Sequence, residues 1–117
     1  MSNTFSNISP KAKIGKGVKI ESFVTIGDDV EIGDNCWIGS NVNIMDGARI
    51  GNNCKIFPGA IISAESQDLK YNGEYAITEI GDNTTVREYV TIHKGTLDKK
   101  TTKVGSNCLL MSYVHVA

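Results

Sequence analysis

Isoleucine recurs at every sixth position through the first half of the chain. The positions with isoleucine are 8, 14, 20, 26, 32, 38, 44, 50, 56 and 62. The same register resumes after two interruptions, with the aliphatic residues Ile80, Val86, Ile92, Val104, Leu110 and Val116. An amphipathic helix repeats its apolar residues at spacings of three and four, so a strict period of six points to a different kind of repeat.

A small or β-branched residue lies two positions before each aliphatic residue, as in Val24, Cys54 and Thr84. Residues two apart on a strand point to the same side, so each hexad supplies one small and one large inward side chain. Glycine often follows the aliphatic residue, at positions 15, 27, 33, 39, 51, 81 and 105, and asparagine comes two residues later at 35, 41, 53, 83 and 107. Both residue types tolerate the positive φ values of sharp corners.

Short strands separated by corners, three to a turn, predict a triangular coil of about 18 residues whose backbone pairs with the coils above and below. We therefore predict an all-β fold, a parallel β-helix of hexapeptide repeats that occupies residues 1–117 as one domain. The spacing leaves the handedness open. The three cysteines, Cys36, Cys54 and Cys108, fall at the small inward position. This position favours core packing over a nucleophile or a metal ligand.

Composition excludes several classes of protein. The formal net charge is −1, which does not suggest nucleic-acid binding. No stretch approaches the roughly 18 apolar residues of a membrane span. The first residues, Met1 to Thr4, lack the basic and apolar regions of a signal peptide, and an odd number of cysteines argues against a disulfide framework. A reducing, intracellular setting fits these features best.

The repeat is interrupted twice, over about residues 63–79 and about residues 95–101. Insertions into a regular solenoid project from one face, which is often the binding face. A long loop on a rigid scaffold is also a functional signal, although the alternative is a tolerated surface excursion.

The two histidines lie in or just after this interrupted region. His93 directly follows an inward aliphatic residue and His115 directly precedes one, so strand alternation points both side chains outward. If the second interruption adds six residues off the coil, His93 and His115 lie on neighbouring coils and line one cleft. The alternative is a pair of ordinary solvated side chains. A zinc site of the catalytic type needs three histidine or equivalent ligands, so we predict no metal site unless a second chain contributes.

Charge is unevenly distributed along the second half of the chain. Residues 61–86 carry one basic and five acidic side chains, whereas residues 87–117 carry five basic and two acidic side chains. The basic segment is suited to attract an acidic partner, although a solvated face explains the same pattern.

Several motifs resemble the acyl carrier protein–UDP-N-acetylglucosamine O-acyltransferase family over nearly the whole chain. The narrowest signals are Gln-Asp-Leu-Lys-Tyr at 67–71 and Thr-Ile-His-x-Gly-Thr at 91–96. The broader ones are Glu-Ile-Gly-Asp at 79–82, Thr-Lys-Val-Gly-Ser at 102–106, and Leu-Leu-Met at 109–111 leading to His115. Hexads alone indicate only the wider hexapeptide-transferase superfamily.

This resemblance implies a left-handed β-helix and a cytoplasmic homotrimer with active sites in clefts between subunits. It implies transfer of a 3-hydroxyacyl chain from acyl carrier protein to the glucosamine 3-hydroxyl of UDP-N-acetylglucosamine, the first step of lipid A biosynthesis, without a cofactor. Gln67, Asp68 and Lys70 are implied to contact substrate, and His93 and His115 to line the cleft. The basic segment would then face the acidic carrier protein.

In this family the catalytic base is the second histidine of a His-x-x-His pair, and His115 matches only the first. A neutral imidazole suits the removal of the hydroxyl proton. The base would follow Ala117, together with further coils and a C-terminal helical domain, so we expect the 117 residues to be an inactive fragment with His93 and His115 in supporting roles. The alternatives are another hexapeptide-repeat sugar acyltransferase that uses acyl-coenzyme A, and a non-catalytic β-helix scaffold.

Overall fold

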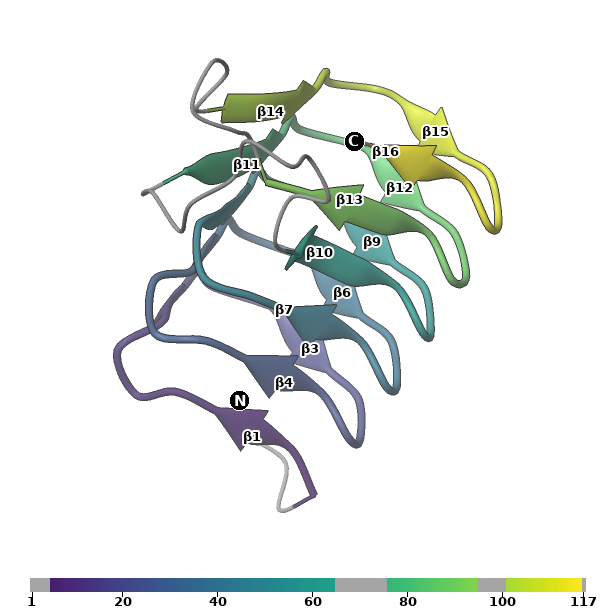
Figure 1. Cartoon of the computed structure of the whole chain (residues 1–117). Coiled ribbons are helices and arrows are strands. Elements are labelled where there is room, and N and C mark those ends of the chain that lie inside the picture. Colours follow the sequence, from purple (N-terminus) through teal and green to yellow (C-terminus); the bar gives the residue numbers. More distant parts are fainter. Residues whose placement is uncertain (1–4, 65–75, 95–100, 117) are drawn as a thin grey trace.

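The computed structural model describes residues 5–64, 76–94 and 101–116, which form a left-handed parallel β-helix (Figure 1). Every regular element among these residues is a short strand, and the strands stack into three parallel sheets. Within the described part of the chain, no helix is long and apolar enough to cross a membrane.

Successive strands belong to sheets A, B and C in turn. Sheet A contains β1 (Asn7–Ile8), β4 (Thr25–Ile26), β7 (Asn43–Ile44), β10 (Ile61–Ala64), β13 (Thr91–His93) and β16 (His115–Val116). Sheet B contains β2 (Lys13–Ile14), β5 (Glu31–Ile32), β8 (Ala48–Ile50), β11 (Ile77–Ile80) and β14 (Thr101–Val104). Sheet C contains β3 (Lys19–Ile20), β6 (Trp37–Ile38), β9 (Lys55–Ile56), β12 (Thr85–Val86) and β15 (Leu109–Leu110).

The aliphatic residues of the repeat form one column inside each sheet, as the period of six predicts. In sheet C, for example, Ile38 pairs with Ile20 on one side and with Ile56 on the other, and Ile56 pairs with Val86. Ile38, Ile56 and Val86 are 0% exposed. Burial of aliphatic side chains of this size contributes about 1.5–3 kcal/mol each before chain entropy is subtracted. The core therefore runs as a continuous rod along the axis of the coil.

Two kinds of residue make the corner between sheets B and C. Asn35, Asn53, Asn83 and Asn107 have φ values of 57–59°, so the prediction of left-handed asparagines at this corner is confirmed. The glycines that directly follow the aliphatic residues do not have positive φ. The prediction of positive φ is therefore wrong for these glycines, which are needed for another reason.

That reason is the close approach of the next coil. A Cβ atom on Gly33 would lie 2.7 Å from the carbonyl carbon of Gly51, whereas a Cβ atom on Gly105 would meet only the Cys108 sulfur at 3.7 Å. The backbone at these corners is also tied between coils, since Asp34 N–H donates to Asn52 Oδ1 at 2.7 Å and Asn52 N–H donates to Asp82 Oδ1 at 2.8 Å. The column of glycines lets successive corners stack without a steric clash.

We expect Gly33→Ala to lower the free energy of unfolding of the 117-residue chain by about 1–3 kcal/mol, as is typical of overpacking. The backbone of residue 51 cannot move aside without breaking the pairing of β5 with β8. The control is Gly105→Ala, for which ordinary van der Waals contact predicts a much smaller change. Urea denaturation followed by circular dichroism measures both, and equal losses would contradict the steric explanation.

The cysteines pack in the core as predicted. Cys36 is 1% exposed and Cys54 is 0% exposed, and their thiols donate to the carbonyl oxygens of Gly51 and Gly81, each at 3.1 Å. The neighbouring Cys54 side chain, followed by burial, raises the pKa of Cys36. Cys108 is partly buried on the last described coil and packs against the same core. These positions give the thiols a structural role.

Ordered strand extends into both stretches expected to interrupt the repeat. β10 continues to Ala64 and β11 begins at Ile77, which leaves 65–75 of the first stretch outside the described residues. β14 begins at Thr101, and 95–100 of the second stretch likewise lie outside them.

Candidate functional site

Both interruptions leave and rejoin the coil at the corner between sheets A and B. The first lies between β10 and β11, and the second lies between β13 and β14 on the next coil. Their ends are neighbours, because β10 pairs with β13 and Ile77 of β11 pairs with Thr101 of β14. The described ends of the two stretches are therefore gathered at one corner of two successive coils.

The two histidines also meet beside this corner. Thr91 pairs with His115 and Ile92 pairs with Val116, so the predicted placement on neighbouring coils is confirmed. The ring centroids of His93 and His115 lie 4.5 Å apart with an interplanar angle of 66°, an edge-to-face contact. The structure thus forms a pair of imidazoles from residues that are 22 positions apart in the sequence.

His93 is not a solvated side chain. It is 6% exposed, whereas His115 is exposed. The alternative of two ordinary solvated histidines is therefore wrong for His93. Strand alternation alone does not predict this burial, because it follows from packing against the neighbouring coils and the contact with His115.

Burial shapes the chemistry of His93. Desolvation, followed by the nearby charge of His115, lowers the pKa of His93, and a backbone hydrogen bond with Val116 only partly opposes this shift. Its Nδ1 atom is buried without a hydrogen-bond partner. Buried polar atoms are normally satisfied, so an open ring nitrogen is a feature to expect where a ligand binds. His93 presents a neutral imidazole at neutral pH.

We expect His93 to titrate with a midpoint below its ordinary value of 6.5. The unfolded chain takes up the proton first, so the stability that neutral His93 contributes is present above pH 6.5 and is lost as pH falls through the folded-state pKa. Proton NMR of the imidazole C2 proton measures the midpoint. His115→Asn removes the neighbouring charge and should raise this midpoint only part of the way, since desolvation is the larger cause. A midpoint at or above 6.5 would contradict the burial argument.

Strand β10 has a β-bulge directly beside His93, which lies on the neighbouring strand β13. Ile62 pairs with Ile92, and the next pair joins Ala64 to His93, so Ser63 is left between them. Ser63 is 0% exposed and has a φ of 66°. Its hydroxyl donates to the carbonyl oxygen of Asp46 at 3.0 Å and accepts from Thr78 Oγ1 at 3.1 Å.

Sequence reasoning missed this bulge. One signal was available, because Ser63 follows an inward aliphatic residue at a position where seven other hexads have glycine. The pairing between coils, which decides how a residue at this position is used, cannot be read from the hexad itself.

The other predicted site residues, Gln67, Asp68 and Lys70, lie outside the described residues. One described end of their segment is close to the histidine pair, since Ala64 pairs with His93 and Lys94 N–H donates to the Ala64 carbonyl oxygen at 2.7 Å. The structure therefore brings His93 and His115 together beside one end of the segment that carries the remaining predicted residues.

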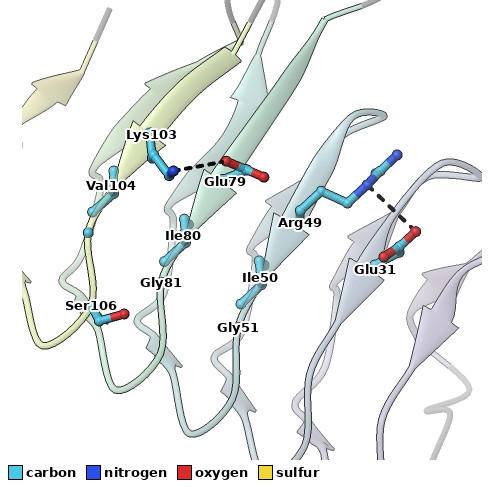
Figure 2. Close-up of a pocket in the computed structure, with 11 residues that line it drawn as sticks. Glu31, Arg49, Ile50, Gly51, Glu79, Ile80, Gly81, Lys103, Val104 and Ser106 are labelled. Carbon is cyan, nitrogen blue, oxygen red and sulfur yellow. Dashed lines mark ion pairs between the residues drawn. The ribbon is translucent and has the colours of Figure 1, made fainter.

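A concave region lies on the outer face of sheet B and has a volume of 470 Å³ (Figure 2). Its charged side chains pair with one another: Arg49 Nε lies 3.6 Å from Glu31 Oε2, and Lys103 Nζ lies 3.9 Å from Glu79 Oε1. They belong to a charge column that alternates in sign from coil to coil, formed by Lys13, Glu31, Arg49, Glu79 and Lys103. This hollow lacks the open nitrogen that distinguishes the histidine pair.

Part of the predicted basic segment is neutralised within the chain. Lys103 pairs with Glu79, and Arg87 Nε lies 3.0 Å from Glu88 Oε1 while its guanidinium lies 4.4 Å from the centroid of the Phe57 ring. These contacts reduce the positive charge that the segment presents, although the side chains of Arg87 and Lys103 stay exposed.

Known proteins resemble this chain in both sequence and fold. The family model described as the GMPPB C-terminal domain matches residues 3–110. Relatives named acyl carrier protein–UDP-N-acetylglucosamine O-acyltransferase include one from Sulfurihydrogenibium, 55% identical over 111 residues, and one from Chlamydia pneumoniae, 42% identical over 110 residues. Each alignment covers 94% of this chain, but 41% and 39% of the respective relatives.

Solved structures show the same relationship. A UDP-N-acetylglucosamine acyltransferase from Bacteroides fragilis is 54% identical, with a TM-score of 0.98 over 100% of this chain and 46% of that chain. One from Campylobacter jejuni is 31% identical, with a TM-score of 0.91 over 98% of this chain and 45% of that chain. The chain spans less than half the length of these relatives. The chain therefore belongs to the family of the GMPPB C-terminal domain model, and over almost its whole length it is similar to part of proteins named UDP-N-acetylglucosamine O-acyltransferases, whose β-helical coil it shares.

Proposed function

We propose that this chain is part of an enzyme that transfers a 3-hydroxyacyl chain from acyl carrier protein to the glucosamine 3-hydroxyl of UDP-N-acetylglucosamine, the first step of lipid A synthesis. The observation that carries the proposal is the contact of His93 with His115 at 4.5 Å, with one ring buried and its Nδ1 open. The names of the relatives supply acyl carrier protein as donor, UDP-N-acetylglucosamine as acceptor and transfer to an oxygen atom, whereas the 3-hydroxyacyl chain, the sugar position and the lipid A step are what the sequence resemblance implies.

The reaction forms one bond and breaks another. The sugar hydroxyl oxygen attacks the thioester carbonyl carbon, the new C–O bond forms, and the C–S bond breaks. A base takes the hydroxyl proton and returns a proton to the departing thiolate, while a hydrogen-bond donor stabilises the developing oxyanion. Two imidazoles on neighbouring coils, one of them buried, are suited to bind and orient the groups that carry these charges.

The proposed division of roles follows the family resemblance. Gln67, Asp68 and Lys70 contact substrate, whereas His93 and His115 line the cleft and support the reaction. The base itself is proposed to be a histidine directly after Ala117, so the 117 residues alone lack it. The share of the relatives that this chain spans, 39–46%, supports the proposal that the enzyme is longer.

We further propose that the enzyme is a cytoplasmic homotrimer, with the cleft formed between subunits. The basic segment 87–117 would face the acidic carrier protein, and Lys103 of this segment keeps 76% of its side chain exposed although it pairs with Glu79. No cofactor takes part in the proposed reaction.

The experiment that tests this function is an acyl-transfer assay on the complete protein of which these residues are proposed to be part. We expect product with UDP-N-acetylglucosamine and a 3-hydroxyacyl carrier protein, and none with 3-hydroxyacyl-coenzyme A. Asp68→Ala and Lys70→Ala should weaken substrate binding, while Lys19→Ala on the exposed face of sheet C should not.

Two outcomes would overturn the proposal. Transfer from acyl-coenzyme A but not from the carrier protein would indicate a different hexapeptide-repeat acyltransferase, and no transfer from either donor would indicate a scaffold. Near-normal turnover by the 117 residues alone would refute the missing base while leaving the reaction intact.

A further inference from the structure

We infer that the hydroxyl groups of Ser63 and Thr78 form a positioning pair that holds β13, and with it His93, in the arrangement the site requires. As a statement about catalysis, the inference rests on the proposed function. As a statement about the placement of His93, it rests on the geometry alone. Neither hydroxyl is assigned a contact with substrate.

The bulge sets the backbone partner of His93. Below the bulge, Ile62 pairs with Ile92, and above it Ala64 rather than Ser63 pairs with His93. The next backbone bond, from Lys94 N–H to the Ala64 carbonyl oxygen at 2.7 Å, follows the shifted register. His93 thus has a backbone partner that the regular hexad does not provide, and its ring lies against the ring of His115.

Contacts inside the coil hold the bulge in place. Ser63 has a left-handed φ of 66° although it is not glycine, and its side chain is fully buried. Residues other than glycine occupy this region at a steric cost, so compensating contacts are needed. The Ser63 hydroxyl satisfies this need twice, by donating to the Asp46 carbonyl oxygen at 3.0 Å and by accepting from Thr78 Oγ1 at 3.1 Å.

Thr78 ties β11, the strand that follows the first interruption, to the bulge at Ser63. Thr78 is 0% exposed and lies on β11, where its N–H donates to the Gly47 carbonyl oxygen at 2.8 Å. The hydroxyl bond therefore joins the last strand before the first interruption to the first strand after it. Three segments of the chain, at residues 46–47, 63 and 78, therefore meet at the bulge.

The chain offers a matched control for Thr78. Thr84 is also a fully buried threonine on the same coil, and its Oγ1 donates to the Gly105 carbonyl oxygen at 2.8 Å. It lies next to sheet C rather than at the corner between sheets A and B. Thr78→Val and Thr84→Val each remove one buried hydroxyl while keeping the shape of the side chain. Thr84 Oγ1 also accepts from Cys108 N–H at 3.3 Å, so its removal costs at least as much hydrogen bonding as that of Thr78, but beside sheet C rather than beside His93.

The test measures the titration midpoint of His93 by NMR and the kinetic constants of the complete protein. We expect Thr78→Val and Ser63→Gly, which keeps the left-handed φ without strain, to raise the His93 midpoint toward 6.5. The same variants should lower kcat severalfold with little change in KM. Thr78→Ser should restore both values, and Thr84→Val should leave the midpoint where it is in the unmodified chain.

The results separate this inference from the proposed function. Equal His93 midpoints in Thr78→Val and Thr84→Val, with both variants folded, would overturn the positioning pair. A shifted midpoint combined with no acyl transfer by the unmodified complete protein would instead overturn the proposed function and leave the pair standing. If Thr78→Val does not fold, Ser63→Gly gives the same decision, because an unshifted midpoint in that folded variant overturns the inference.

Discussion

Replacing Ile56 by alanine is expected to lower the free energy of unfolding by about 2–5 kcal/mol. The side chain is 0% exposed and lies between Ile38 and Val86 in the column of sheet C. Backbone hydrogen bonds fix the spacing of the coils on both sides, including Trp37 N–H to the Cys54 carbonyl oxygen at 2.9 Å. The neighbouring coils cannot close over the cavity, so both the transfer and the cavity terms are lost.

Urea denaturation followed by circular dichroism measures this loss. Ile56→Val provides a graded control, for which about 0.5–1.5 kcal/mol is expected. Ile14→Ala provides a positional control, because Ile14 is only partly buried in the first coil. If Ile14→Ala and Ile56→Ala destabilise the chain equally, the explanation from a closed inner column is wrong.

Replacing His93 by alanine is expected to reduce kcat/KM for acyl transfer by the complete protein about 10- to 100-fold. The reason is that a hydrogen bond accepted by the open Nδ1 from a charged or reacting group contributes about 1.5–3 kcal/mol. The open Nδ1 and the buried, neutral ring make His93 the described residue best prepared to provide it. The expectation depends on the proposed function, and the assay is the same acyl transfer from carrier protein.

The control for this variant is Asn43→Ala on the outer face of the same sheet. Asn43 is exposed on β7 and lies two strands below β13 in the order of sheet A. We expect its removal to leave kcat/KM unchanged. Circular dichroism establishes that both variants keep the coil. An active parent protein whose His93→Ala variant retains full kcat/KM would remove His93 from the site.

The architecture was largely predictable because each hexad specifies one strand and one corner, and three successive hexads make one coil. The isoleucine period gave the inward column, the small position gave the burial of Cys36 and Cys54, and the length of the second interruption gave the contact between His93 and His115. Each of these depends only on residues that are a fixed spacing apart. The asparagine corners followed for the same reason, since their φ is a local property.

The features that were missed arise between coils. The burial of His93 depends on the ring of His115 and on the bulge at Ser63, and the bulge in turn depends on two hydroxyl contacts with residues 17 and 15 positions away. The glycines that follow the aliphatic residues were assigned to the wrong cause, because the backbone of the next coil is not visible in a single hexad. Contacts of this kind carry no signature at a fixed spacing.

The charge column on sheet B restricts how the gene can change in length. Its signs alternate through Lys13, Glu31, Arg49, Glu79 and Lys103, so each coil faces opposite charges above and below. Deleting the single coil that contains Arg49 would set Glu31 directly against Glu79, and like charges opposite one another destabilise a sheet. Removal or duplication of two coils together would preserve the alternation. The alternation therefore favours the gain or loss of coils two at a time over the gain or loss of a single coil.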